Sequence, residues 1–211
     1  MARLHPVLRL QDYERLLRRR RLWVSGPVVL EEKLDGALLV AYEGRIYTGA
    51  GRRAPGWMVR ALEETGADPW GAVGLLLYIE LYGRCLTPGG YHRGDPECYR
   101  AALVDAARPP ASAGVLWEAV LQARVLEPWE RLAAAEEAGM ESPRAVALYA
   151  ERPPEPGEML RWLDMFPGRE GYVMKLYAVH GHRLPPEHGA KLRGVLEVKV
   201  RQANRGSRLQ A

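Results

Sequence analysis

Lysine is scarce in this 211-residue chain, which contains four lysines against 26 arginines. Most positions that need only a positive charge are therefore filled by arginine. An arginine side chain stays protonated and cannot act as a nucleophile at neutral pH, whereas a lysine amine can lose its proton when it is desolvated or crowded by other cations. The lysines therefore mark positions where a guanidinium would not serve, and they are Lys33, Lys175, Lys191 and Lys199.

Cysteine is nearly absent as well, with only Cys85 and Cys98. The two could pair, but they match neither a disulfide framework nor a zinc pattern, so we expect reduced thiols in a cytoplasmic protein. No apolar run approaches the roughly 20 residues that a membrane span needs, and no membrane association is expected. The first hydrophobic residues are interrupted by Arg9, Asp12 and Glu14, which is unlike a signal peptide.

The length predicts a single domain over residues 1–211. The formal net charge is +4 and the sequence pI is about 9.2. A modest positive excess suits a polyanionic partner such as nucleic acid, but it does not require one. The arginine run at 18–21 has the same ambiguity, because such runs are more often solvated surface than nucleic-acid contacts.

The hydrophobic pattern predicts an α+β fold, because helices and strands follow one another without regular alternation. Helices are expected where apolar residues recur at helical spacing, and strands where short apolar runs are bounded by turn residues. The segment 115–126 is ambiguous between helix and strand. The expected helices are 8–21, 57–65, 128–138 and 158–163, and the expected strands are 28–30, 37–42, 45–47, 75–81, 99–106, 145–149, 171–177 and 195–201.

Several of these apolar strands carry a single charged residue. Lys33 and Asp35 would point to one face of a strand, and Gly36, which lacks a Cβ, would let the backbone approach a ligand closely. Glu80 is a lone acid in an apolar run, and burying such a charge is costly unless it is paired or binds something. Any one of these residues alone is more often a salt-bridge partner. Together with Lys175 they indicate a pocket for a nucleoside triphosphate and its metal.

Three ordered motifs carry a resemblance to a known family. They are Glu-Lys-Leu-Asp-Gly around Lys33, Ile-Glu-Leu-Tyr-Gly around Glu80, 47 residues after Lys33, and Glu-Gly-Tyr-Val-Met-Lys from Glu170 to Lys175, which starts 90 residues after Glu80. This set resembles the covalent nucleotidyltransferases, which are the ATP-dependent DNA ligases, RNA ligases and mRNA capping enzymes. The resemblance implies an ATP-grasp-like adenylation domain with antiparallel sheets flanked by helices.

The resemblance also implies roles for individual residues. Lys33 would be the nucleophile that takes AMP from ATP, and Lys175 would contact the α-phosphate. Glu80 would bind the ribose, and Glu170 would organise a divalent metal, Mg²⁺ or Mn²⁺. Arg52 would contact the sugar and the incoming phosphate, with Arg53 as a possible substitute. The residues around the nucleophile that join this ATP-binding set are Glu32, Asp35 and Gly36.

Two positions depart from the family pattern. The last motif is a pair of lysines on the final strand, and Glu197-Val198-Lys199 fits it with an acid in the first slot. Lys191 also fits, but it lies in a segment flanked by glycine and proline, so Lys199 is favoured on strand character. Where the family has an aromatic residue stacking on the base, this chain has Val104, followed by Asp105. Aliphatic packing, or Tyr99, would then replace the stacking.

The motif form and the short spacing are more similar to RNA ligases than to DNA ligases. The chain ends soon after Lys199, so we expect no appended oligonucleotide-binding barrel, and either a minimal RNA ligase catalytic domain or a ligase working with a separate substrate-binding partner protein. A minimal DNA ligase and a non-catalytic nucleic-acid-binding relative are the alternatives. The histidines at 180, 182 and 188 could suggest a metal, but solvated histidines are favoured in this proline-broken segment.

Overall fold

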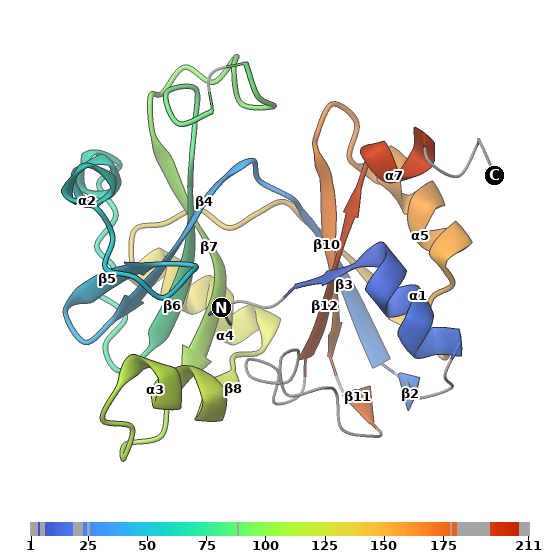
Figure 1. Cartoon of the computed structure of the whole chain (residues 1–211), viewed down its shortest axis with the longest axis horizontal. Helices are drawn as coiled ribbons and strands as arrows, with labels where there is room; N and C mark the ends of the chain where they lie inside the picture. Colours follow the sequence, from blue (N-terminus) through green and yellow to red (C-terminus); the bar gives the residue numbers. More distant parts are fainter. Residues whose placement is uncertain are drawn as a thin grey trace. The chain divides into compact units, whose positions relative to one another are not determined.

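A computed structural model describes residues 4, 7–18, 23–24, 26–87, 89–177, 179–180 and 195–206. The chain divides into two compact units. Unit 1 contains residue 4 and the described residues of 35–143. Unit 2 contains the described residues of 7–34, 144–180 and 195–206. Each unit is built on a five-stranded sheet (Figure 1).

The sheet of unit 1 has the strand order β5-β4-β6-β7-β8, and every neighbouring pair is antiparallel. The alternation of side chains places Leu39, Ile79 and Leu103 on one face, where they join the main core of the unit. The strands are β4 (Gly36–Tyr42), β5 (Arg45–Thr48), β6 (Leu76–Tyr82), β7 (Arg100–Arg108) and β8 (Arg124–Val125).

Three helices cover this sheet. Residues of α2 (Gly56–Glu64) and α4 (Pro128–Glu137) pack into the main core, whereas α3 (Leu116–Gln122) packs with Val40 and Tyr78 on the opposite face. That second cluster covers only one end of its face, around Tyr78 and Val40. Glu80 lies on the same face, two residues further along β6.

The sheet of unit 2 has the order β1-β12-β10-β3-β9. Its pairs are antiparallel except for β1 and β12, which run parallel, so the expectation of antiparallel sheets needs this correction. Its strands are β1 (Leu8–Arg9), β3 (Gly26–Glu32), β9 (Ala145–Ala150), β10 (Gly171–Tyr177) and β12 (Val195–Arg201). A separate two-stranded sheet pairs β2 (Trp23–Val24) with β11 (Val179–His180).

Helices cover one face of the unit 2 sheet, as Figure 1 shows for α1 (Leu10–Arg18) and α5 (Pro156–Arg161). Tyr172 of β10 donates a hydrogen bond to the carbonyl of Met159, and its ring stacks on Phe166. Burial raises the pKa of the Tyr172 hydroxyl far above its ordinary value, so Tyr172 stays a donor. The 3₁₀ helix η1 (Trp162–Met165) continues α5, and α7 (Ala203–Gly206) follows β12.

The two helices that begin with proline, α4 and α5, each have a capping box at the N-terminus. In α4, Glu127 accepts a hydrogen bond from the backbone of Glu130, while the Glu130 side chain accepts one from the backbone of Glu127. Glu155 and Glu158 form the same capping box in α5. Such a box satisfies N–H groups that have no partner within the helix, so the sequence Glu-Pro-x-Glu fixes where both helices begin.

The sequence predictions agree with most elements and fail at some boundaries. The helix expected at 8–21 begins only at Leu10, because residues 8 and 9 pair with β12 as β1. The ambiguous segment 115–126 contains both a helix and a strand, since α3 is followed by β8. No helix in the described ranges is long and apolar enough to span a membrane.

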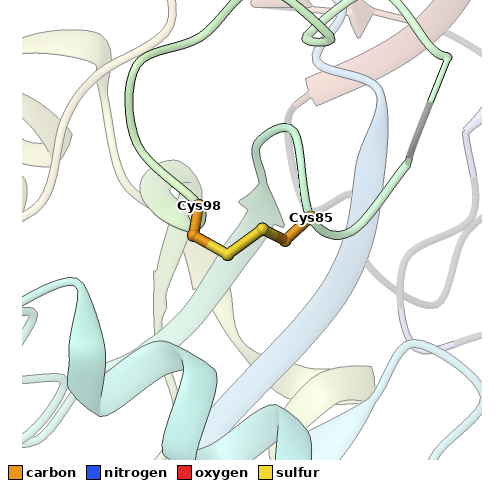
Figure 2. The surroundings of a disulfide bond; sticks show 2 residues. All are labelled: Cys85 and Cys98. Atoms are coloured by element: carbon orange, nitrogen blue, oxygen red, sulfur yellow. A yellow bond between two sulfur atoms is a disulfide. The ribbon is translucent and has the colours of Figure 1, made fainter.

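The prediction of reduced thiols was wrong. Cys85 and Cys98 form a disulfide (Figure 2), with their Cα atoms 4.9 Å apart across 13 residues of sequence. Both residues lie in the connection between β6 and β7, whose ends the antiparallel pairing of these strands brings together. Count and spacing could not reveal this pairing, because the sheet register decides it.

Candidate functional site

Three lysines share one face of the unit 2 sheet. Val173 of β10 lies opposite Glu31 of β3 on one side and Lys199 of β12 on the other, while Lys175 lies opposite Glu197. Residues directly opposite one another point to the same face, and so do residues two apart on one strand. Lys33, two residues after Glu31, continues this face past the end of β3. The alternate residues, including Tyr172 and Met174, point to the helix-covered face.

A buried ion pair lies in the middle of the lysine face. The Lys175 ammonium lies 2.8 Å from a carboxylate oxygen of Glu31, and each side chain is only 2% exposed. Glu197, opposite Lys175 on β12, is fully buried. Ionic groups are rarely buried unless they are paired or bind a charged ligand. The face is therefore a buried array of alternating charge rather than a solvated surface.

Lys33 makes the second ion pair of this face. Its ammonium lies 2.5 Å from Oε2 of Glu170, and it also donates to the carbonyl of Leu34. The other oxygen of Glu170 lies 2.8 Å from Nε of Arg201 on β12. The Lys33 and Glu170 side chains are 16% and 14% exposed, so the amine is shielded yet reachable from solvent. Glu170 thus holds two cations, one on each carboxylate oxygen.

The remaining candidates of unit 2 are placed differently. Glu32 lies opposite Tyr172, on the other face from Lys33, and pairs with Arg169 at 3.1 Å. The structure therefore does not bring the Glu32 carboxylate into the lysine array. Lys199 is half-buried on the lysine face. Lys191 lies outside the described residues, so the choice between Lys199 and Lys191 stays a prediction.

In unit 1, Glu80 lies on β6 between Leu38 of β4 and Ala102 of β7. Its side chain is half-buried, on the face whose other end is covered by α3. Val104 is the extra residue of a β-bulge, because the pairing passes from Leu103 to Asp105 while β6 advances by a single residue. Val104 packs against the α3 cluster.

The arginine candidates lie at the end of β5. Arg52 is exposed, and its carbonyl accepts hydrogen bonds from the backbone and hydroxyl of Thr48, which close a tight loop. Arg53 pairs with Tyr47 in an isolated bridge and lies over the Tyr47 ring at 5.6 Å. Arg53 is therefore engaged by the aromatic ring, and the assignment of Arg52 as the ligand-contacting arginine stays a prediction.

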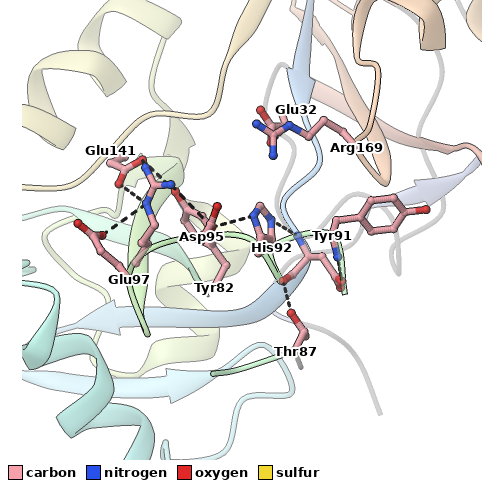
Figure 3. A network of polar contacts seen from close by, with 11 residues as sticks. Glu32, Tyr82, Thr87, Tyr91, His92, Asp95, Glu97, Glu141 and Arg169 are labelled. Carbon is pink, nitrogen blue, oxygen red and sulfur yellow. Dashed lines mark hydrogen bonds and ion pairs between the residues drawn. The ribbon is translucent and has the colours of Figure 1, made fainter. Parts of the chain in front are cut away.

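Asp35 is held by the loop that joins β6 to β7, and Figure 3 labels the loop residues Thr87, Tyr91 and His92. Its backbone N–H donates to Nε2 of His92 at 3.2 Å, and its carbonyl accepts from Thr87 at 3.2 Å. Its carboxylate accepts a longer bond from the backbone of Tyr91. Gly36 follows, and a Cβ there would lie 2.2 Å from the carbonyl oxygen of Leu81. The sheet itself therefore requires this glycine.

Sequence reasoning missed several of these residues. Glu31 is a buried acid in an apolar strand, and the rule applied to Glu80 would have found it. Glu197 was noted only as the acid in the first slot of the final motif, and its burial was not predicted. His92 and Arg201 carried no signal, because their partners are distant in sequence. Among the described residues no group of three or more His, Cys, Asp or Glu side chains is arranged to hold a metal. His180 lies in β11, while His182 and His188 lie outside the described residues.

Glu170 is the candidate for holding a divalent cation. Mg²⁺ is usually bound by one or two carboxylates together with substrate phosphates and water, rather than by an all-protein cage. Glu170 fits this pattern, because its carboxylate is partly exposed and lies beside the Lys33 amine. A metal held there would neutralise charge on a triphosphate.

No protein-family model matches the sequence, and no curated protein matches it. Solved structures do match. An archaeal ATP-dependent RNA ligase has 17% sequence identity and a TM-score of 0.58, with 97% of this chain and 49% of the ligase covered. A Naegleria gruberi RNA ligase variant with ATP and Mn has 13% identity and a TM-score of 0.56, with 96% and 57% covered.

A second Naegleria gruberi RNA ligase variant, with AMP and Mn, has 13% identity and a TM-score of 0.57, with 97% of this chain and 57% of the ligase covered. The chain thus spans about half the length of the solved ligases that it matches. Identities this low establish the fold and not the activity. The resemblance carried by the three motifs is confirmed at that level: the chain shares its fold with about half of each of these RNA ligases.

Proposed function

We propose that this chain is an ATP-dependent nucleotidyltransferase of the RNA ligase type, in which Lys33 becomes covalently attached to AMP. The observation that carries the proposal is the shared face of β3, β10 and β12. It gathers Lys33, Lys175 and Lys199, three of the four lysines in a chain that otherwise uses arginine. The fold likeness to ATP-dependent RNA ligases adds support.

The first step is attack of the Lys33 amine on the α-phosphate of ATP. A nitrogen–phosphorus bond forms, the bond to the β-phosphate oxygen breaks, and pyrophosphate leaves while the amine loses a proton. Nearby cations stabilise charge on the transferring phosphoryl group. Lys175 and Lys199 supply those cations in this proposal.

The other candidates bind the nucleotide in the same proposal. Glu80 would accept hydrogen bonds from the ribose, and Arg52 would contact the sugar and the incoming phosphate. Val104 would pack against the base in place of an aromatic ring. Asp35 and Gly36 complete the set around the nucleophile. All of these residues lie in unit 1, and their roles follow from the motif resemblance.

A divalent metal, Mg²⁺ or Mn²⁺, is part of the proposal, and Mn accompanies the nucleotide in the solved RNA ligases named above. When bound, the metal would screen the triphosphate and assist departure of pyrophosphate. Glu170 is the residue that would hold it. Within the chain itself, Glu170 orients the Lys33 amine, because the two side chains are in direct contact.

The AMP would then pass to a 5′-phosphate end, with cleavage of the nitrogen–phosphorus bond and return of a proton to Lys33. A 3′-hydroxyl would attack that phosphate and displace AMP. We propose RNA ends as the substrate, with one adenylyltransferase domain over residues 1–211 and a separate substrate-binding partner protein as a further possibility. A cytoplasmic location stays a prediction, and the Cys85–Cys98 disulfide makes reducing agent a variable to control in every assay.

The deciding experiment is incubation with ATP labelled at the α-phosphate, followed by a denaturing gel. Wild-type protein should retain label, and Lys33→Arg should retain none, because a guanidinium cannot deprotonate. Arg45→Lys, at an exposed position of β5, is the matched control for a lysine–arginine exchange and should label normally. Undiminished labelling of Lys33→Arg would refute the assignment of the nucleophile.

Whether RNA or DNA is the substrate is tested by supplying adenylylated enzyme with matched nicks and single strands of RNA and of DNA. RNA joining should be faster, since discrimination would come from 2′-hydroxyls near the junction, and it should weaken steeply with salt if arginines grip the backbone. Sealing of an all-DNA nick at least as fast as any RNA end would favour the DNA ligase alternative. Self-labelling without any sealing would instead point to a missing partner.

A further inference from the structure

The connection between β6 and β7 reaches back to Asp35, a residue of the nucleophile motif, and its Thr87, Tyr91 and His92 are labelled in Figure 3. Its Cys85–Cys98 disulfide closes the base of the loop. Three of its residues then engage a single residue, Asp35: His92 accepts from its N–H, Thr87 donates to its carbonyl, and the Tyr91 backbone donates to its carboxylate. A surface loop with no other role has no need of three bonds to one residue.

The state of the His92 ring follows from its partners. A backbone N–H can only donate, so Nε2 of His92 must carry no proton, and the proton of the neutral ring must sit on Nδ1. Nδ1 lies 3.2 Å from a carboxylate oxygen of Asp95. The ring is 3% exposed and lies 4.7 Å from the ring of Tyr82. The Nδ1–Asp95 contact does not have hydrogen-bond geometry, so the bond from Asp35 selects the tautomer of His92 and the contact with Tyr82 holds its ring.

The contacts continue from Asp95 to Arg100, the first residue of β7, and from there to Glu141. Arg100 lies 3.7 Å from Asp95 and pairs with both carboxylate oxygens of Glu141, at 2.9 and 2.6 Å. Tyr82 donates to Glu141 at 2.9 Å. Burial, and then the hydrogen bond to Glu141, raise the pKa of the Tyr82 hydroxyl far above its ordinary value, so Tyr82 stays a donor.

The network lies close to two boundaries between the units along the chain. Asp35 is the first residue of unit 1 after the chain leaves unit 2, two residues beyond Lys33, and Glu141 lies two residues before the chain leaves unit 1 at Pro143. The network thus fastens unit 1 at two of the places where the chain passes between the units. A residue acting there would affect the nucleophile through the backbone, without touching substrate.

We propose that His92 is a positioning residue for nucleotidyl transfer, which fixes the Asp35 peptide and with it the chain segment that leads from Lys33 into unit 1. This rests on the proposed function. Removing the acceptor should slow self-adenylylation at saturating ATP about ten-fold, the usual scale for one lost hydrogen bond to a buried group. The ATP concentration for half-maximal rate should change less than the rate, because His92 acts through Asp35 and does not itself bind the nucleotide.

Two substitutions separate positioning from general stability. His92→Leu removes the acceptor, whereas His92→Gln places an amide oxygen near the position of Nε2 and should restore most of the rate. Arg93→Leu, at the exposed neighbouring residue, is the control and should behave as wild type. A merely structural histidine would show no such rescue by glutamine, because glutamine cannot restore the ring packing on Tyr82.

The Asp35 amide gives a readout that needs no activity. In a ¹⁵N-labelled sample its proton shift should report the hydrogen bond to Nε2 of His92. The shift should therefore move in His92→Leu, which lacks an acceptor, and should return most of the way in His92→Gln. Arg93→Leu should leave it unchanged.

Slow labelling of His92→Leu, rescue by His92→Gln and an Asp35 amide shift that moves in His92→Leu and returns in His92→Gln would support the proposal. Labelling of a folded His92→Leu at the wild-type rate would overturn it. If His92→Leu does not fold, His92→Gln decides, and slow labelling by a His92→Gln protein whose Asp35 amide keeps its wild-type shift overturns the proposal. If wild type does not label at all, the proposed function fails, and an Asp35 amide that is identical in wild type and a folded His92→Leu would refute the positioning role separately.

Discussion

Replacing Lys175 by methionine should destabilise the protein mainly through the acid that the change leaves behind. Lys175 and Glu31 lie 2.8 Å apart, and both side chains are 2% exposed. Removing one partner of a buried ion pair costs about 3–5 kcal/mol, because the remaining charge is buried without compensation. At about 2–4 °C per kcal/mol for a chain of this size, the melting temperature of Lys175→Met should fall by about 6–20 °C.

The double variant Glu31→Leu/Lys175→Met removes the stranded charge as well. Replacing a whole buried ion pair by apolar residues of similar volume is often neutral or stabilising, so most of the lost melting temperature should return. Adenylylation should not return, because the cation facing the α-phosphate is still missing. Stability and activity thus separate in one pair of variants, which a purely structural Lys175 would not allow.

The measurement is thermal unfolding followed by circular dichroism, with labelling from α-labelled ATP at a temperature where all variants are folded. Glu31→Leu alone is the matched control for the other side of the pair, and it should also be less stable than wild type. A single variant Lys175→Met that melts with wild type, or a double variant that labels as fast as wild type, would refute the reasoning.

Three further predictions follow from the described contacts. Lys199→Ala should slow adenylylation about ten-fold or more, because one charge-assisted contact worth roughly 1.5–3 kcal/mol is lost. A larger loss of rate for Lys191→Ala in the same labelling assay would show that Lys191, and not Lys199, is the lysine of the final motif. Replacing Cys85 and Cys98 together by alanine should lower the free energy of unfolding by about 3 kcal/mol for a loop of this length, as measured by urea denaturation. An unchanged urea midpoint would contradict this prediction, because it would show that the disulfide does not restrict the unfolded chain enough to affect stability. The backbone hydrogen bond within the α4 capping box lowers the pKa of the Glu130 carboxyl, so its contribution is present above the unfolded-state pKa and is lost as pH falls through the folded one. Glutamine can still form the capping box but lacks the charge, so Glu130→Gln should reduce stability by about 0.3–1 kcal/mol near neutral pH. The gap in melting temperature from wild type should close on acidification, and a gap that stays constant with pH would contradict this account.

The lysine face could be predicted from the sequence because it depends on local rules. The scarcity of lysine selected Lys33, Lys175 and Lys199, and the two-residue period of a strand determines which face each side chain takes once the strands are paired. The strands around Lys175 and Lys199 were also predictable, since both lysines lie in short runs of mostly apolar residues. That the lysines share one face depends in addition on the pairing of β3, β10 and β12.

The features that were missed depend on pairing between distant segments. The disulfide and the bonds from His92 to Asp35 follow from the β6–β7 and β4–β6 registers, which no local pattern specifies. The Glu32 carboxylate was assigned to the ATP-binding set because of its place in the motif, but alternation sends it to the opposite face from Lys33. The segment 115–126 contains a helix and a strand because packing on the unit 1 core, and not periodicity, decides where the helix ends.

The glycines beside the lysines have a consequence for recognising relatives of this protein. A Cβ at position 171 would lie 1.9 Å from the carbonyl oxygen of Val200, and Gly171 has φ of +152°; at Gly36 the obstacle is the carbonyl of Leu81. Both glycines are therefore demanded by neighbouring strands, whether or not a nucleotide ever binds. A distant homologue that had lost its chemistry would still have to keep them, so the glycines of such motifs identify the architecture, and only the lysines can tell an enzyme from an inactive descendant.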